Sequence, residues 1–488
     1  MLPHQNLFPL RSWQARASWA LALGCCACQG PAVHSPTPLT AKDYVLIPAQ
    51  ESSHQMGRNG EEPRETGATT QTLDLASALR EGGASSLQVA LAREELAAAE
   101  AQLDAAQVLM LPTLTVGGGY QDHDGALQET QGSILQVERN SGFLRGGLIA
   151  TIDLAQAFME PARAGYQAQA ASQNVRASVN SNLTTIALAH QDLLQAQIQV
   201  TETEADRALA AELVELTEAF ASAGQGLEAD ASRARAELSQ RARIAVAAEQ
   251  NLRMRSTRLA TLLRLDPDTP LRTKEKHLIP LALINTSTSL DELLALAQES
   301  RPELRVLQAS LRAQEQGERQ EQWSVLIPQL DLGLYSGRLG GGEGSKFRDY
   351  TEEDQFSATL TWSLRNLGLG ESAARREATA RTKSARLRFL MAQDQVAQEV
   401  TLAHLEVQAG PAQIEYAAQN VREAAASLDL NLRRSRAAEG LPIEALQAIR
   451  ANAQAKQAMS ETLARFNRAQ FHLLQAVGSV PQHAIGPE

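Results

Sequence analysis

Few residues in this sequence combine the types and spacings that enzymes use. The run Gly340–Lys346 superficially resembles a phosphate-binding loop, but no lysine directly follows the necessary glycine and no strand-loop-helix pattern surrounds it, so it reads as an exposed loop. The nine histidines, among them His123, His190, His404 and His472, show no paired spacing on one helical face. No Ser/His/Asp arrangement stands out either. We therefore predict no enzyme, no cofactor and no metal site.

The only cysteines lie close together near the N-terminus, at Cys25, Cys26 and Cys28, so no disulfide or thiolate chemistry is available later in the chain. They follow a short apolar stretch, Ala17–Gly24, that has the order of a secretory signal and is too short to span a bilayer. Gly24-Cys25 resembles a bacterial lipobox, although Ala22 stands where leucine is usual. We predict a signal peptide over residues 1–28 with lipid attachment at Cys25. Ordinary cleavage near Ala27 is the alternative.

Composition excludes one class of partner and favours helices. With 45 Lys+Arg against 56 Asp+Glu, the formal net charge of −11 argues against nucleic acid. A chain that is 43% hydrophobic, largely through alanine, and only 4% aromatic is typical of long packed helices. Residues 29–70 are rich in Pro, Ser, Gly and Glu and have little apolar periodicity, so we predict a disordered tether there.

The rest of the chain consists of two copies of one plan. Thr72-Leu73-Asp74 recurs as Ser289-Leu290-Asp291, 217 positions later. Leu111-Pro112-Thr113-Leu114 recurs as Ile327-Pro328-Gln329-Leu330, 216 positions later. We predict a first repeat over residues 72–266, a linker over 267–288, a second repeat over 289–478 and a tail over 479–488.

Each repeat has the order helix, strand, strand, very long helix, glycine break, helix. Helical periodicity predicts helices at residues 87–109, 157–222, 227–264, 302–326, 367–438 and 443–477. Two shorter helices placed end to end can pack along the long one, giving a rod of about 90 to 100 Å at 1.5 Å per residue. A purely structural coiled coil is the alternative, but it would not need the strands.

The strands alternate apolar and polar residues. The apolar side includes a set that we predict to face lipid: Leu114, Val116, Leu330, Leu332, Leu360 and Trp362. Each strand approaches the ~9 to 11 residues of a tilted transmembrane β-strand. The polar, Gly-rich stretches 121–140 and 336–355 are predicted to be external loops. A soluble sandwich would alternate in the same way, but the further strands it needs are missing.

Four strands cannot close a barrel, and an open strand edge cannot exist in lipid. If these strands span a membrane, the chain must therefore form an oligomer. Three chains would supply twelve strands, which is within the size range of known barrels. We predict a mainly α fold with a small β part, assembled as a homotrimer.

In this order, and duplicated, the motifs resemble the TolC-like outer-membrane factor family over residues 72–478. They are Arg301-Pro302-Glu303-Leu304, Val325–Leu332, Phe356–Leu364 with the glycine-containing turn after it, and the breaks at Gly224 and Gly440. The resemblance implies a trimeric α-helical barrel and a 12-stranded transmembrane β-barrel with four strands per chain. It further implies an outer-membrane channel that extends into the periplasm and serves an inner-membrane efflux pump or type I secretion complex through a periplasmic adaptor protein. Many members are acylated at an N-terminal cysteine, which fits Cys25.

In the family, the turn after each longest helix forms the periplasmic aperture and docking tip. The resemblance assigns to it Gly224, Glu228, Asp230, Gly440, Glu444 and Gln447. The glycines would supply the positive φ that such a turn uses. The second repeat departs from the family, because Gln447 stands where some members carry a second aspartate. The alternative is that these carboxylates only stabilise helix N-termini, by about 0.3 to 1 kcal/mol each.

Two alternatives remain open at the level of function. One is an exported periplasmic coiled-coil scaffold without a membrane barrel, in which the strands form a small soluble sheet. The other keeps the channel but changes its cargo from small molecules or metal ions to peptides or proteins. The sequence does not distinguish these cargoes.

Overall fold

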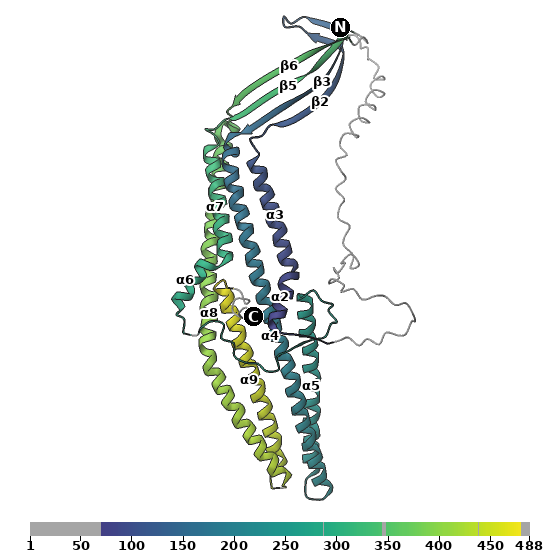
Figure 1. Ribbon diagram of the computed structural model, residues 1–488, viewed down its shortest axis with the longest axis vertical. Helices are drawn as coiled ribbons and strands as arrows, with labels where there is room; N and C mark the ends of the chain where they lie inside the picture. The colour runs from purple at the N-terminus through teal and green to yellow at the C-terminus, as the bar shows by residue number, and fades with distance from the viewer. Residues whose placement is uncertain (1–69, 286, 344–347, 438, 480–488) are drawn as a thin grey trace, which may run out of the picture. The chain divides into compact units, whose positions relative to one another are not determined.

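The computed structural model describes residues 70–479 except 286, 344–347 and 438 (Figure 1). The predicted signal peptide, Cys25, the tether up to residue 69 and residues 480–488 of the tail lie outside the described residues. The described residues fall within one compact unit of the chain.

The first half of this unit contains β1 (Gln71–Leu73), α2 (Leu75–Ser85), α3 (Leu87–Gln107), β2 (Thr113–Gln128), β3 (Ile134–Asp153), α4 (Leu154–Ser222), α5 (Glu228–Leu262) and β4 (Leu271–Thr273). The second half contains α6 (Leu290–Ser300), α7 (Pro302–Trp323), β5 (Gln329–Glu343), β6 (Arg348–Thr361), a short 3-10 helix η1 (Arg365–Gly368), α8 (Leu369–Arg436) and α9 (Pro442–Ala476). The order of two helices, two long strands, a very long helix and a final helix thus occurs twice.

The six predicted helices are all present, with ends within three residues of those expected. The short helices α2 and α6 were not predicted. They are separate because Ser86 and Arg301 adopt extended backbone conformations, which end one helix just before the next begins. Ser86 caps α3 by accepting a hydrogen bond from Val89 N–H, and Pro302 occupies the first turn of α7, where its missing N–H costs nothing.

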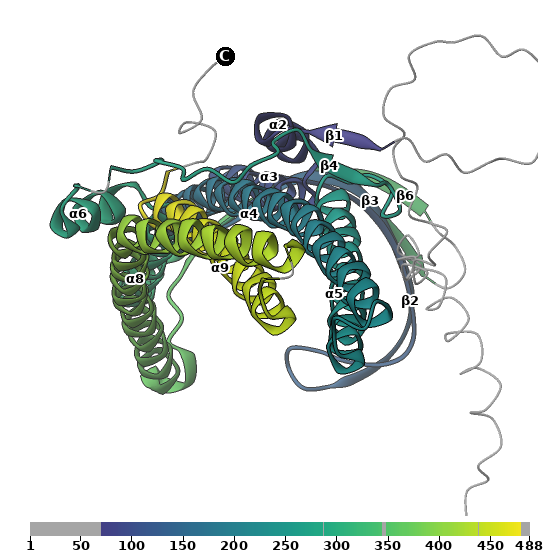
Figure 2. The same cartoon turned by 90° about the horizontal axis from the view of Figure 1, so that it is seen from below.

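The helices form a curved layer in which α4 packs against α3, α5, α7 and α9 and against the short α2 (Figure 2). Next to the sheet the order across the layer is α3, α4, α7, α8; in the half farther from the sheet it is α5, α4, α9, α8 (Figure 1). One edge of the layer is therefore α8, and the other is α3 continued by α5. Alanine and leucine fill most of the core, and the widest apolar cluster gathers Leu79, Ile186, Leu259 and Phe471 beside the β1–β4 pair.

The four long strands form one antiparallel sheet in the order β2-β3-β5-β6. The strands have 16, 20, 15 and 14 residues, longer than the expected transmembrane length. The prediction of long external loops at 121–140 and 336–355 was wrong, since Gln121 pairs with Ser141 and Ser336 pairs with Asp354 within the sheet. Polar, Gly-rich side chains do not prevent main-chain pairing, so the ladder continues past the apolar part of each strand.

One aromatic cluster lies across the strands that join the two halves. The guanidinium carbon of Arg145 is 4.9 Å from the Phe143 ring centroid and 5.0 Å from the Tyr335 centroid. A Cβ atom on Gly147 would lie 2.3 Å from the Leu334 main-chain oxygen and 2.7 Å from the Tyr335 ring, and one on Gly119 would lie 2.6 Å from the Phe143 ring. These glycines leave the space that the two rings occupy.

Candidate channel wall and aperture

The strand register places the predicted lipid-facing residues on one side of the sheet. Leu114 pairs with Leu148, Leu148 with Leu334, and Leu334 with Phe356, which gives an unbroken apolar row across all four strands. Leu114 and Phe356 are each 72% exposed. Residues paired directly in a sheet share a face, so this row is a continuous apolar surface open to the surroundings.

Nearer the helices, the same face continues with the row Ile152, Leu330 and Leu360. Leu330 and Leu332 are half-buried, because they pack on Ala150 and Ile152. The prediction that Trp362 belongs to this strand was wrong, since β6 ends at Thr361 and the exposed Trp362 follows it.

At the level of the apolar rows, the opposite face of the sheet is mainly polar. Thr151 pairs with Asp331 and Asp331 with Thr359, and the next row consists of Thr113, Ile149, Gly333 and Ser357. A sheet with one apolar and one hydroxylic or charged face suits a wall between lipid and water. Among the described residues, no helix is long and apolar enough to cross a membrane.

The first hairpin tip joins α4 to α5. Gly224 has φ +71°, the left-handed conformation predicted for this turn. Glu228 and Asp230 lie in the first turn of α5, as the sequence indicated. Arg235 donates to Glu218 of α4 at 2.9 Å and to Glu228 at 2.7 Å, while Arg233 donates to Asp230 at 2.7 Å. The acidic side chains of this tip are therefore partly neutralised within the chain.

Replacing Gly224 with alanine is expected to lower the free energy of unfolding by about 1 kcal/mol, because a Cβ atom disfavours the left-handed conformation. No atom lies within 4 Å of the added Cβ, so the cost is one of backbone strain alone. Gly165→Ala within α4 is the matched control and should stabilise by about 0.5 to 1 kcal/mol. Chemical denaturation of both variants checks the opposite signs. Equal effects would contradict the role of Gly224.

The second tip joins α8 to α9 and repeats main-chain hydrogen bonds of the first: Glu439 and Gly440 N–H donate to the Arg434 carbonyl, as Gln225 and Gly226 N–H donate to the Phe220 carbonyl. Gly440 does not have a positive φ, so the prediction of a left-handed glycine was wrong here. Its N–H donates to the Arg434 carbonyl, and an added Cβ would lie 3.0 Å from Arg434 Cβ, so close approach explains the glycine. Glu444 lies in the first turn of α9 and accepts from Arg434 at 3.1 Å, while Gln447 is exposed.

A charged cluster that the sequence did not reveal joins the two hairpins. Glu237 of α5 is only 2% exposed and accepts from Arg241 Nε and from Arg450 Nε of α9, each at 2.7 Å. Asp206 of α4 is also buried, and its oxygens lie 4.0 Å from Arg241 and from Lys456 of α9. Arg241 is four residues after Glu237, but Arg450 and Lys456 are far away in sequence, so local spacing could not have indicated the contacts that join the two hairpins.

The two buried carboxylates respond oppositely to their surroundings. Burial alone would raise the pKa of Glu237, but the hydrogen bonds from Arg450 and Arg241 outweigh it and hold that pKa below its ordinary value. At Asp206 burial dominates and raises the pKa, although Lys456 and Arg241 oppose it. Glu237 is therefore the stabilised anion of the cluster.

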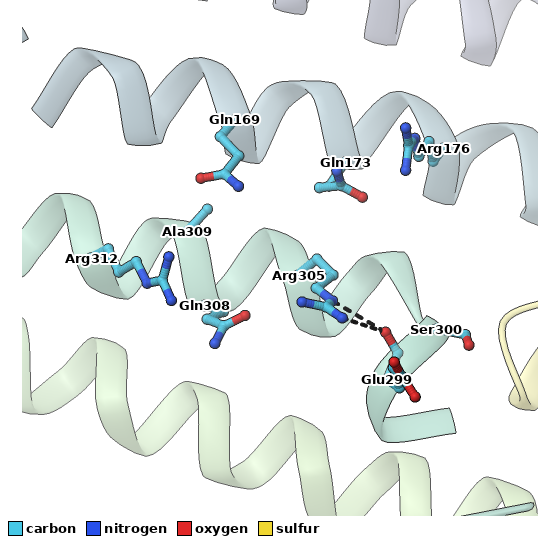
Figure 3. A pocket seen from close by; sticks show the side chains of 9 residues that line it. All are labelled: Gln169, Gln173, Arg176, Glu299, Ser300, Arg305, Gln308, Ala309 and Arg312. Carbon is cyan, nitrogen blue, oxygen red and sulfur yellow. Dashed lines mark hydrogen bonds between the residues drawn. The ribbon is translucent and has the colours of Figure 1, made fainter. Parts of the chain in front are cut away.

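Where α6 meets α7, at the end of α7 that is farther from the sheet, a polar groove of about 400 Å³ lies between α4 and α7 (Figure 3). Its lining consists mainly of glutamine and arginine: Gln169, Gln173, Arg176, Glu299, Ser300, Arg305, Gln308, Ala309 and Arg312. Arg305 donates twice to the Glu299 carbonyl, at 3.2 and 2.7 Å. Within the described part of the chain, no group of three or more His, Cys, Asp or Glu side chains is placed to hold a metal ion.

Comparison with solved structures assigns the fold to a class. VceC of Vibrio cholerae matches with a TM-score of 0.71 at 18% identity, over 83% of this chain and 96% of that one. A membrane protein of Pseudomonas aeruginosa gives 0.73 at 16%, over 87% and 97%. The CmeC outer membrane channel of Campylobacter jejuni gives 0.74 at 13%, over 87% and 94%. The fold is that of outer-membrane channel proteins. No curated protein sequence matches the chain.

The sequence itself supports the same class. Residues 293–479 match the family model of the outer membrane efflux protein, so the chain carries an outer membrane efflux protein domain. The resemblance to TolC-like outer-membrane factors is thereby confirmed, as is the mainly helical fold with a small antiparallel sheet. The matched domain and structures belong to channels and not to enzymes.

Proposed function

We propose that this chain is one subunit of a trimeric channel that lies in the bacterial outer membrane and extends through the periplasm. The observation that carries the proposal is that the sheet and the helical layer have their open edges on the same two sides of the chain. The sheet ends in β2 on one side and β6 on the other, and the helical layer ends in α3 and α5 on the first side and α8 on the second.

Ring closure satisfies all of these edges at once. If β6 of one subunit pairs with β2 of the next, α8 of the first is brought beside α3 and α5 of the second. Such a head-to-tail contact closes into a ring when the rotation between subunits divides a full turn. Three subunits give a closed barrel of twelve strands, with no unpaired main chain in lipid. The apolar rows then face lipid and the polar face lines the pore.

In this proposal the channel acts by passive conduction. Cys25 anchors the chain to lipid, and residues 72–266 and 289–478 act as two equivalent repeats. The aperture and docking tip comprise the two hairpin turns with Gly224, Glu228, Asp230, Gly440, Glu444 and Gln447. A periplasmic adaptor and an inner-membrane pump or type I secretion complex dock there, and solute passes when the hairpins move apart.

Separation of membranes on a density gradient, followed by mass determination of the detergent-extracted particle, tests the proposal. We expect a trimer that bands with outer membranes and forms conducting pores in planar bilayers. A soluble periplasmic monomer or dimer would contradict it and favour the exported scaffold. The cargo class requires a separate measurement of solute export in cells with the partner pump.

A further inference from the structure

The two edges of the helical layer carry opposite charges that make no ion pair within the described part of the chain. On α8, Arg376, Lys383 and Arg388 are exposed and, among the described residues, make no ion pair. The neighbouring basic residues of α8 are engaged, since Arg381 pairs with Glu377 and Arg386 pairs with Glu315 of α7.

The opposite edge shows the complementary pattern. Glu94, Glu100 and Asp104 of α3 are exposed and also make no ion pair within the described residues. The only basic residue of α3 is Arg93. Many arginines and carboxylates elsewhere in the described chain are paired, whereas these two strips of opposite sign, one on each edge, are not.

The two strips lie at the same level along the helical layer. Contacts between neighbouring helices show which residues lie at the same level. Asn174 of α4 contacts Glu95 of α3, and Arg163 of α4 lies beside Gly317 of α7. Thr379 and Thr382 of α8 contact Glu318 and the Gln314 carbonyl of α7. At about 1.5 Å per residue, these contacts place Lys383 level with Asp104. Arg388 then lies about one helical turn from the level of Glu94.

Both charged strips also lie on the outward side of their helix. On α8 the buried Thr382 faces α7, so at about 100° per residue the exposed Leu387 and Met391 lie on the opposite, outward side, with Lys383 beside them. On α3 the buried Val89 and Ala92 face α4, so the exposed Leu91 lies outward. Helices α8 and α3 run in opposite directions. With the same rotation of about 100° per residue, Lys383 and Asp104 lie on the same side of the α8–α3 contact that ring closure creates.

We infer that the partner of the basic strip on α8 is the acidic strip on α3 of a second copy of this chain, with Lys383 facing Asp104 and Arg388 facing Glu94. The inference rests on the proposed ring closure and adds to it the residues that set its direction. Opposite charges at matched levels favour contact of α8 with α3 of the next subunit. They disfavour a two-fold dimer in which α8 meets α8 or α3 meets α3.

Charge reversal in the full-length, detergent-extracted protein tests this pairing. Lys383→Glu and Asp104→Lys, made singly, should each raise the monomer-to-trimer ratio about tenfold or more, because the unfavourable contact occurs at three interfaces. The double variant should return the ratio to that of the wild type. Arg319→Glu is the matched control, since Arg319 is exposed on α7 near the same level but away from both edges. Native mass spectrometry gives the ratio, and circular dichroism checks that each variant is folded.

The outcomes separate this inference from the function on which it rests. A wild-type protein that is monomeric at every concentration would contradict the proposed channel and this inference together. A trimeric wild type with single variants that stay trimeric would overturn the inference alone. Single variants that dissociate without rescue by the double variant would overturn the Lys383–Asp104 pairing. Dissociation of Arg319→Glu to the same extent would show that the effect is not specific to the edges.

Discussion

Phe356→Arg is expected to prevent insertion of the sheet into the outer membrane. Phe356 ends the apolar row that crosses all four strands, and it is exposed in the single chain. An arginine on the lipid face near the bilayer midplane costs about 2 to 4 kcal/mol, and a trimer carries the change three times, for about 6 to 12 kcal/mol in all. Membrane separation with antibody detection should show the protein lost from the outer-membrane fraction.

Ser357→Arg is the matched control for this experiment. Ser357 is the next residue of β6 and lies on the polar face, opposite Gly333. An arginine there points into water in the proposed barrel, so the variant should still insert and form trimers. Normal insertion of Phe356→Arg would show that the apolar face does not meet lipid, and the scaffold would then be the better description.

Glu237→Ala is expected to lower the free energy of unfolding of the helical layer by about 2 to 4 kcal/mol. The substitution leaves Arg241, which is largely buried, without its closest carboxylate, and it removes the 2.7 Å hydrogen bond from Arg450 of α9. Denaturant titration measures the loss. Hydrogen exchange should rise most in α9 around Arg450, where the first hairpin no longer holds the second.

The pH dependence of this effect has a definite sign. The pKa of Glu237 in the folded chain lies below its ordinary value of 4.5, so its stabilising contribution is fully present above about that pH and is lost as pH falls through the folded pKa. The difference between wild type and Glu237→Ala should therefore shrink in acid. Glu249→Ala, which removes looser pairs with Arg253 at 3.6 Å and Arg272 at 3.9 Å, should change stability by less than about 0.5 kcal/mol and serves as control.

The sequence predicted the long helices well because each repeats its apolar positions over many turns. Its strand alternation was also informative, since Leu114, Leu330 and Leu360 do share one face of the sheet. The ends of the strands were not predictable in the same way. Side chains around Gln121 and Ser336 are polar and flexible, but hydrogen bonding between strands depends on the main chain and on the partner, which no local window contains.

The charged contacts were harder to predict from the sequence than the ends of the strands. Glu237 and Arg450 are 213 residues apart, and only the packing of α9 against α4 and α5 brings them together. Gly440 illustrates the same limit at a single position. Its place in a turn suggested a left-handed glycine like Gly224, yet the φ of Gly440 itself is not positive, and the absent side chain makes room for Arg434.

The ring of Tyr335 above Gly147 has a consequence for how the chain folds. The pairing of β3 with β5 joins the two repeats, and it can form only after the whole of α4 and α5 has been made, so it is a late and slow step. A shift of the β3–β5 pairing by one residue would turn every apolar side chain of the shifted strand to the wrong face of the sheet. A shift by two residues keeps each side chain on its face but pairs Tyr335 with Arg145 or Ile149 instead of with Gly147, which has no side chain. The missing side chain at Gly147 thus selects one register from those that alternation alone would permit.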